Sequence, residues 1–339
     1  MPGKRPRNEK RKGRARLSKQ ASSEQIVEKA RPAVQAWLRL RPGSSEPGGV
    51  TLLKNTSRSI VCRIEGMGPG GSGVVAKRCR RTDGELEAFI YSEVLDRLSM
   101  ESARCYGFIN EDGGDHGWLF LEDCGITKVT EKGGSFPTAF AHWLALLHGS
   151  ASNLPIRGRL PDRGPAWYLE ILRAARLGLC QSLAERNLTE LDRLAFETML
   201  VCFEVLERNW HILEERCEGL PWTLVHCDLQ PKNILTRQTP SGVAFLPLDW
   251  EDAGWGSPAT DLAEIDATSY WSTAIRTWAG IELRQVEEQA RCGAVFQILA
   301  AVGWEIVRLA AGSEEKAMRR LRIYAPRLTA STQALGLEV

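Results

Sequence analysis

The stretch LVHCDLQPKNIL at residues 224–235 decides the fold that we expect for this chain. Two apolar pairs, at residues 224–225 and 234–235, flank a polar loop, and each pair predicts a short buried strand. The loop between them carries Asp228 and Asn233. A turn that is held at both ends by buried strands projects these two polar side chains from a fixed base.

The next apolar run, at residues 243–248, ends directly at a second acidic residue, Asp249. The segment RQTPSG at residues 237–242 supplies a turn that would bring this run back beside the loop. We therefore expect Asp249 to converge with Asp228 and Asn233. Phosphoryl transfer needs this set of groups, because one carboxylate orients the acceptor proton while an amide and a second carboxylate hold Mg²⁺ on the nucleotide phosphates.

Three ordered segments resemble motifs of the aminoglycoside phosphotransferase and choline kinase group, within the protein kinase-like superfamily. Residues 226–233 (HCDLQPKN) resemble its H-G-D-x-x-x-x-N loop. Residues 248–251 (LDWE) resemble its I-D-W-E segment, and residues 256–263 (GSPATDLA) resemble its G-D-P-x-x-D-L-A element. The sequence departs from these motifs at Cys227, Lys232 and Ser257, where glycine, a small residue and aspartate are usual.

The resemblance implies a role for each polar residue of the motifs. Asp228 corresponds to the catalytic base, and Asn233 and Asp249 correspond to the metal ligands. Asp261 corresponds to a structural residue that bonds the backbone of the catalytic loop, and His226 is expected to brace that loop rather than carry protons. The resemblance also implies ATP or GTP, together with Mg²⁺, as cofactors.

The implied fold class is α+β, of the bilobal protein kinase-like type, with a small antiparallel-sheet N-lobe and a larger helical C-lobe. The apolar pattern agrees, since strand-like runs come first, at residues 59–64, 73–77 and 118–122, and helical spacing follows from Phe136. The expected domains are a disordered basic tail at 1–20, a short helix and linker at 21–48, the nucleotide-binding N-lobe at 49–121, a hinge at 122–128, and the helical C-lobe with the catalytic loop and acceptor pocket at 129–339.

Proline and glycine set two local expectations near the N-terminus. A helix over residues 22–40 should restart at Pro32, because proline is tolerated in a first turn but not in a helix interior. Gly66, Gly68 and Gly71 match the pattern G-x-G-x-x-G, yet a β-branched strand follows them, whereas a dinucleotide fingerprint opens a helix. We therefore expect these glycines to form a flexible hairpin connection.

Lys77 ends a Val-Val-Ala strand and resembles the strand lysine that contacts the α- and β-phosphates. An ordinary exposed strand-end lysine is the alternative. Its expected partner is a glutamate on the next helix, where Glu85 and Glu87 compete. The segment TDGE at residues 82–85 fits a capping box, which would fold Glu85 back onto the helix start. Glu87 then shares one face of the predicted helix with its apolar residues, and we therefore expect Glu87 to pair with Lys77.

The resemblance assigns two further segments to the nucleotide. Residues 55–59 precede a strand and would hold phosphate through backbone N–H and hydroxyl groups, with Ser57 among them. A simple hydrophilic hairpin turn is the alternative there. Residues 121–124 lie where the interlobe hinge of the family binds adenine, through backbone groups of residues such as Glu122 and Cys124.

The charge of the chain is uneven along its length. Lys and Arg number 44 and Asp and Glu number 42, a formal net charge of +2, but residues 1–20 hold nine basic residues and one acidic residue. The remaining 35 basic and 41 acidic residues leave the body at −6. We expect the tail to be a solvated extension, with nucleic-acid contact as the alternative.

Cysteine usage and hydropathy bear on the compartment. The nine cysteines include no CxxC pair, which speaks against a zinc site or a disulfide framework and fits a reducing cytoplasm. The longest apolar stretch, at residues 294–304, is shorter than a membrane span, and no signal-peptide pattern is present. A cytoplasmic protein that makes no membrane contact is expected.

These observations favour an ATP-dependent O-phosphotransferase that phosphorylates a hydroxyl of a small molecule, aminoglycoside-like or choline-like. Four acidic residues near the motif make a cationic acceptor one candidate: Glu251, Asp252, Glu264 and Asp266. A protein kinase is disfavoured, because only eleven residues separate Asp249 from Asp261 and leave no room for a long activation segment. A non-catalytic nucleotide-binding scaffold is the alternative, and the sequence leaves the acceptor and the oligomeric state open.

Overall fold

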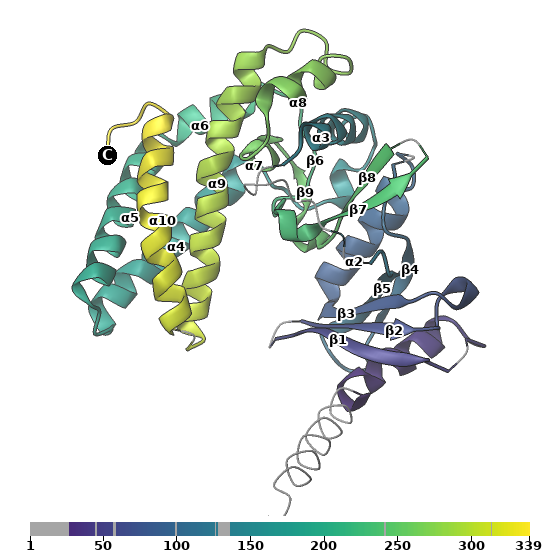
Figure 1. Ribbon diagram of the computed structural model, residues 1–339. Coiled ribbons are helices and arrows are strands. Elements are labelled where there is room, and N and C mark those ends of the chain that lie inside the picture. The colour runs from purple at the N-terminus through teal and green to yellow at the C-terminus, as the bar shows by residue number, and fades with distance from the viewer. Residues whose placement is uncertain are drawn as a thin grey trace, which may run out of the picture. The chain divides into compact units, whose positions relative to one another are not determined.

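The computed structural model describes residues 27–44, 46–56, 59–98, 100–125, 127, 136–240, 242–312 and 314–339. These residues form two compact units (Figure 1). Unit 1 holds the described residues up to Asp96 together with Ser102–Gly125, and unit 2 holds Arg97–Glu101 and the described residues from 127 onward. The basic tail predicted at residues 1–20 and the predicted nucleotide contact Ser57 lie outside the described residues.

Unit 1 is built on one antiparallel sheet with the strand order β1-β2-β3-β5-β4. Its strands are β1 (Gly49–Asn55), β2 (Ile60–Glu65), β3 (Val74–Arg80), β4 (Cys105–Asn110) and β5 (His116–Glu122). The three predicted strand runs correspond to β2, β3 and β5. The apolar pattern does not predict β1 and β4, because β1 is a largely exposed edge strand and β4 is mostly half-buried.

A helix packs on this sheet, and residues 27–40 of it are described. Its small buried residues Ala30 and Ala33 and the ring of Trp37 join the sheet core. The Trp37 ring meets Phe120 edge-on, with centroids 5.2 Å apart. The predicted restart at Pro32 is wrong, since residues 27–40 are helical throughout. Proline removes one backbone hydrogen bond, and packing on both sides of it holds the helix together.

The glycine-rich segment connects β2 to β3, as predicted, through a 3₁₀ turn at Pro69–Gly71. Gly70 and Gly71 adopt positive φ angles of 65° and 76°, which glycine accepts without strain. After β3 the chain passes directly into α2 (Arg81–Phe89), which continues as a π-helical turn, Ile90–Leu95. The predicted capping box is wrong, because the helix begins at Arg81 and Arg80 stands at the cap position without a side-chain cap.

Unit 2 is mainly helical. Its helices are α3 (Thr138–Ala151), α4 (Pro165–Glu185), α5 (Glu190–Arg208), α6 (Trp210–Cys217), α7 (Ala259–Leu262), α8 (Ala267–Ala274), α9 (Leu283–Ala310) and α10 (Glu314–Ala334). Two small antiparallel sheets pair β6 (Thr223–Val225) with β9 (Gly254–Gly256), and β7 (Ile234–Thr239) with β8 (Gly242–Pro247). The β7–β8 hairpin is the turn expected after the polar loop.

The core of unit 2 forms around α9, which lies beside α10 and α4 in Figure 1. Phe296 of this helix stacks on Tyr168 of α4, with ring centroids 4.2 Å apart. By length and composition α9 could cross a membrane, and half of its most apolar 18-residue window is buried inside the protein. Its apolar residues Val295, Leu299 and Val302 are fully buried, which is the pattern of a core helix.

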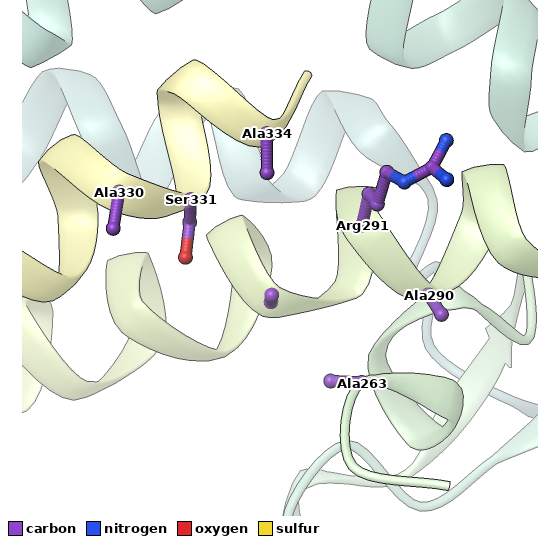
Figure 2. Close-up of a pocket in the computed structure, with 7 residues that line it drawn as sticks. Ala263, Ala290, Arg291, Ala330, Ser331 and Ala334 are labelled. Atoms are coloured by element: carbon purple, nitrogen blue, oxygen red, sulfur yellow. The ribbon is translucent and has the colours of Figure 1, made fainter. Parts of the chain in front are cut away.

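A shallow hollow of about 310 Å³ lies where α9, α10 and the end of α7 meet. Figure 2 shows its lining, which is mostly alanine with Arg291 and Ser331 at the sides. None of the predicted site residues lines this hollow.

Candidate active site

The loop at residues 226–233 runs from β6 to β7 and places Asp228 and Asn233 together. Asn233 Nδ2 donates to Asp228 Oδ2 at 2.8 Å and to the Asp228 backbone carbonyl at 3.0 Å. The side chain of Asp228 is partly exposed, whereas Asn233 is buried at the end of the 3₁₀ turn Pro231–Asn233. Because the amide nitrogen faces Asp228, the side-chain Oδ1 of Asn233 is the atom left to bind a cation.

Two further side chains of this loop contact Asp228. Gln230 Nε2 donates to Asp228 Oδ1 at 2.6 Å, and Lys232 Nζ lies 3.7 Å from Asp228 Oδ2. Sequence reasoning did not assign either contact, although the spacing of two and four residues from Asp228 was visible. The carboxylate therefore meets amide groups on both oxygens and an ammonium group beside one of them.

Asp261 holds the start of the loop from α7. Its Oδ2 accepts a hydrogen bond from the backbone N–H of His226 at 2.7 Å, and its Oδ1 accepts one from Cys227 at 2.9 Å. A third contact comes from His148 Nε2 at 3.3 Å. All of Asp261 and His148 is buried, so these bonds replace water completely. The prediction that Asp261 bonds the catalytic-loop backbone is confirmed.

The position of α7 depends on a glycine in α9. Gly293 is buried against α7, and a Cβ atom at this position would lie only 1.8 Å from the carbonyl oxygen of Ala259. That carbonyl belongs to backbone, which cannot swing aside as a side chain does. Glycine at 293 therefore allows the close approach that sets Asp261.

His226 ties the loop to the strand that carries Asp249. Its Nδ1 accepts the backbone N–H of Asp228 at 3.3 Å, so Nε2 is the protonated nitrogen and donates to the Leu248 carbonyl at 3.0 Å. The Leu248 N–H in turn donates to the Asn233 carbonyl at 2.7 Å. Both ring nitrogens of His226 are engaged, which fits the expected bracing role. Asp249, the next residue after Leu248, is thereby fixed beside the loop.

Asp249 and Cys227 have unusual backbone conformations. Asp249 has φ 69° and ψ 56°, and Cys227 has φ 65°. The left-handed region costs about 1–2 kcal/mol for a residue with a Cβ atom. Glycine, the usual residue of the family at the Cys227 position, would adopt this angle freely. The structure thus accounts for the family pattern and for the strain that cysteine accepts here.

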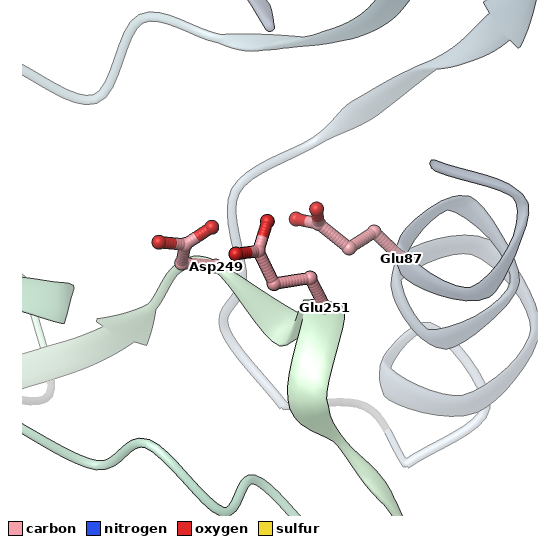
Figure 3. A group of neighbouring side chains, drawn as sticks. All are labelled: Glu87, Asp249 and Glu251. Atoms are coloured by element: carbon pink, nitrogen blue, oxygen red, sulfur yellow. The ribbon is translucent and has the colours of Figure 1, made fainter. Parts of the chain in front are cut away.

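An acidic group follows Asp249 on the same turn. Figure 3 shows Asp249 and Glu251 on the turn after β8, and Glu87 on α2 of the other unit. Carboxylate oxygens of Asp249 and Glu251 lie within 4.8 Å of each other. The pKa of Asp252 is raised to about 6, mainly by burial and also by the negative charges of Glu251 and Asp228, while the charge of Arg163 opposes the shift. The turn therefore concentrates negative charge that a cation would relieve.

Unit 1 contains a buried ion pair between Lys77 and Glu87. The Nζ atom of Lys77 lies 2.6 Å from Oε1 of Glu87, and both side chains are at least nine-tenths buried. Glu85 on the same helix is exposed. The prediction that Lys77 pairs with Glu87 rather than Glu85 is confirmed. Lys77 is not the exposed strand-end lysine that was the alternative.

The remaining predicted nucleotide contacts lie at two ends of the unit 1 sheet. Thr56 and Ser59 close the β1–β2 turn through a 3.0 Å backbone bond, with Ser57 outside the described residues. Glu122 donates its N–H to the Arg104 carbonyl at 2.8 Å, and Cys124 Sγ lies 3.7 Å from the Glu122 carbonyl. These contacts fix the segment that was expected to meet adenine, and the adenine contact itself stays a prediction.

The profile of the Phosphotransferase enzyme family matches residues 62–308, a span that includes Lys77, the polar loop and Asp261. The chain belongs to this family. It is therefore an enzyme of the phosphotransferase class, with an α+β protein kinase-like fold. No curated protein sequence matches this phosphotransferase significantly.

Solved structures with the same fold are distant in sequence. Spectinomycin phosphotransferase APH(9)-Ia, crystallised with ADP and spectinomycin, is 10% identical, with a TM-score of 0.61 and coverage of 90% of this chain and 98% of that one. Choline kinase from Cryptosporidium parvum Iowa II is 13% identical, with a TM-score of 0.57 and coverage of 92% and 96%. APH(2")-IIIa with GDP and kanamycin is 14% identical, with a TM-score of 0.56 and coverage of 87% and 97%.

Proposed function

We propose that this phosphotransferase moves the γ-phosphoryl group of ATP or GTP to a hydroxyl group of a small molecule. The arrangement of Asp228 carries the proposal, because its carboxylate is oriented by Asn233 and lies partly exposed on a loop fixed by Asp261. A general base has to be accessible and held in place. Asp228 meets both conditions.

The proposed reaction transfers one phosphoryl group and one proton. The acceptor oxygen forms a bond to the γ-phosphorus, and the bond from that phosphorus to the β-γ bridging oxygen breaks, with its electron pair leaving on the nucleoside diphosphate. Asp228 accepts the hydroxyl proton and later releases it to solvent. Gln230 and Asn233 hold the carboxylate in one orientation during this step.

Asn233 and Asp249 fit a site for Mg²⁺. Oδ1 of Asn233 and the carboxylate of Asp249 are hard oxygen donors, which this ion prefers, and the excess of negative charge on the turn favours a divalent cation. When bound, Mg²⁺ would neutralise charge on the nucleotide phosphates. Glu251 contributes further negative charge beside Asp249.

Unit 1 would bind the nucleotide. The buried pair of Lys77 and Glu87 fixes an ammonium group on β3, in the role that we propose toward the α- and β-phosphates. Ser57 is proposed as a phosphate contact, and Glu122 and Cys124 are proposed as backbone contacts of the base.

The nine cysteines are all free, which supports a cytoplasmic location for the enzyme.

The acceptor class that we favour is an amine-containing alcohol. Structural relatives include a choline kinase, an ethanolamine kinase and the spectinomycin phosphotransferase. Glu251 and Asp252 give the turn beside Asp228 the negative charge that an ammonium group would seek.

A panel assay tests the proposed function. The purified chain is incubated with Mg²⁺, ATP or GTP, and each of spectinomycin, kanamycin, choline, ethanolamine and aminopropanol, and phosphorylated product is measured by mass spectrometry. We expect product with at least one acceptor, and a loss of about 10²–10⁴-fold in rate for Asp228→Asn. Glu197→Gln, an exposed change on α5, serves as the control. Tight nucleotide binding without product for any acceptor would support the non-catalytic scaffold instead.

A further inference from the structure

Lys232 is the residue of the loop that the family pattern leaves without a role. It lies in the 3₁₀ turn Pro231–Asn233, between the proposed base and the proposed metal ligand. Its side chain is 57% exposed, and its ammonium group lies 3.7 Å from Asp228 Oδ2. Among the described residues this is the ion pair that the structure records for Lys232. The positive charge is thus held beside the base and remains open to solvent.

Lys232 is not needed to orient the carboxylate of Asp228. Gln230 and Asn233 already donate hydrogen bonds to the two carboxylate oxygens, at 2.6 Å and 2.8 Å. The contact from Lys232 is too long for a hydrogen bond. An exposed ion pair four residues apart on the chain contributes at most about 1 kcal/mol. Within the described residues the ammonium group makes no recorded hydrogen bond, so its N–H donors can turn toward a ligand.

The reaction brings a suitable ligand into reach. An acceptor hydroxyl lies about 2.7 Å from its base, and its oxygen lies about 3–3.5 Å from the phosphorus that it attacks. The transferred group therefore passes within roughly 6 Å of Asp228 Oδ2. It carries negative charge on three equatorial oxygens, and a lysine ammonium binds such oxygens as a point charge. Rotation of an exposed lysine side chain covers this distance.

We propose that Lys232 is a catalytic residue that contacts the phosphoryl group while it is transferred. This inference rests on the proposed function and names a contact that the family motif does not supply, since a small residue is usual at this position. The contact forms with the transferring group more strongly than with the bound nucleotide. Its effect therefore falls on kcat and leaves nucleotide binding largely intact.

Three variants separate charge from shape. Lys232→Met removes the charge and keeps most of the side-chain volume, and Lys232→Arg keeps the charge. Lys316→Met is the matched control, because Lys316 is an exposed lysine on α10. We expect Lys232→Met to lower kcat about 10–100-fold with the nucleotide KM within about 3-fold, and Lys232→Arg to recover most of the loss.

A binding measurement gives a readout that needs no acceptor turnover. Calorimetry compares the affinity for Mg·ADP alone with the affinity for Mg·ADP in aluminium fluoride, which mimics the planar phosphoryl group. We expect wild-type protein and the Lys316→Met control to gain affinity from aluminium fluoride, and Lys232→Met to lose about 10-fold or more of that gain. Binding of Mg·ADP alone should match in all variants.

Several outcomes would overturn the inference. Unchanged kcat and an unchanged aluminium fluoride gain in Lys232→Met would leave no role for the charge. A lower kcat with the full aluminium fluoride gain would make Lys232 a positioning residue that acts through Asp228. Loss of Mg·ADP binding itself would assign it to the ground-state nucleotide. If no acceptor is phosphorylated by the wild-type chain, the proposed function fails, and the calorimetric comparison still decides on Lys232.

Discussion

The carboxylate of Asp261 lies 2.7 Å from the backbone nitrogen of His226, 35 residues away along the chain. Its second oxygen lies 2.9 Å from the nitrogen of Cys227. One buried carboxylate on α7 thus fixes two consecutive peptide units immediately before Asp228. The geometry of the proposed base is therefore set from outside its own loop.

Asp261→Asn tests the role of these two hydrogen bonds. The NH₂ group of the asparagine side chain cannot accept a hydrogen bond. One of the two backbone N–H groups, of His226 or Cys227, would therefore face another donor. We expect a loss of about 2–4 kcal/mol in the free energy of unfolding and of about 10²-fold in kcat. Urea unfolding and product formation measure the two effects. Asp266→Asn is the control, because Asp266 caps α8 through the Ser269 N–H and asparagine caps equally well. Equal losses of stability and of kcat in the two variants would contradict the proposal that Asp261 fixes the catalytic loop.

Substitutions at Cys227 test whether its backbone conformation is strained. At φ 65° a Cβ atom is disfavoured and glycine is not. We expect Cys227→Gly to exceed Cys227→Ala in the free energy of unfolding by about 1 kcal/mol, since alanine keeps the strain while both variants lose the thiol. Thermal denaturation of the pair measures the difference. Greater stability of the alanine variant would show that backbone strain does not govern this position.

The ion pair of Lys77 and Glu87 allows folding and nucleotide binding to be separated. Lys77→Met removes this cation from a buried carboxylate, and we expect it to lower the free energy of unfolding by about 3–5 kcal/mol. The double variant Lys77→Met/Glu87→Leu should recover most of that stability, because neither charge remains. Nucleotide affinity, measured by calorimetry, should stay low in both. Recovery of nucleotide binding in the double variant would refute the proposed role of Lys77.

The raised pKa of Asp252 predicts that the stability of the metal-free protein depends on pH. Its pKa is about 6 in the folded chain against an ordinary value of 3.8, so the folded state binds more protons between these values. The free energy of unfolding therefore falls as pH rises from about 4 to 6, and the loss persists at higher pH. Asp252→Asn should be more stable than wild type by about 1–3 kcal/mol at pH 8 and equal to it near pH 4. Unfolding in EDTA across this range checks the trend, and a difference that is constant with pH would contradict it.

The sequence predicted those parts of the fold that local patterns determine. β2 and β3 carry β-branched residues, β5 carries a continuous apolar run, and the polar loop is marked by apolar pairs on both sides. The pairing of Lys77 with Glu87 followed from helix periodicity, even though the capping box used to exclude Glu85 was wrong. Glu85 is excluded because it lies on the exposed face of α2.

Other features depend on contacts between distant segments and leave no local signal. The helix passes through Pro32 because Ala30, Ala33 and Trp37 pack on the sheet. β1 and β4 are completed by their neighbours in the sheet. The contacts of Gln230 and Lys232 with Asp228 depend on a tight turn whose side-chain directions spacing alone does not give.

The contact of Gly293 with Ala259 extends the proposed active site into a helix that carries none of its groups. Any side chain at residue 293 would push α7 outward, and Asp261 would move with it. A substitution there should resemble a catalytic-loop variant in its kinetics while lying far from that loop in the sequence. In redesigning the acceptor specificity of this phosphotransferase, residue 293 therefore belongs with the positions to be kept constant.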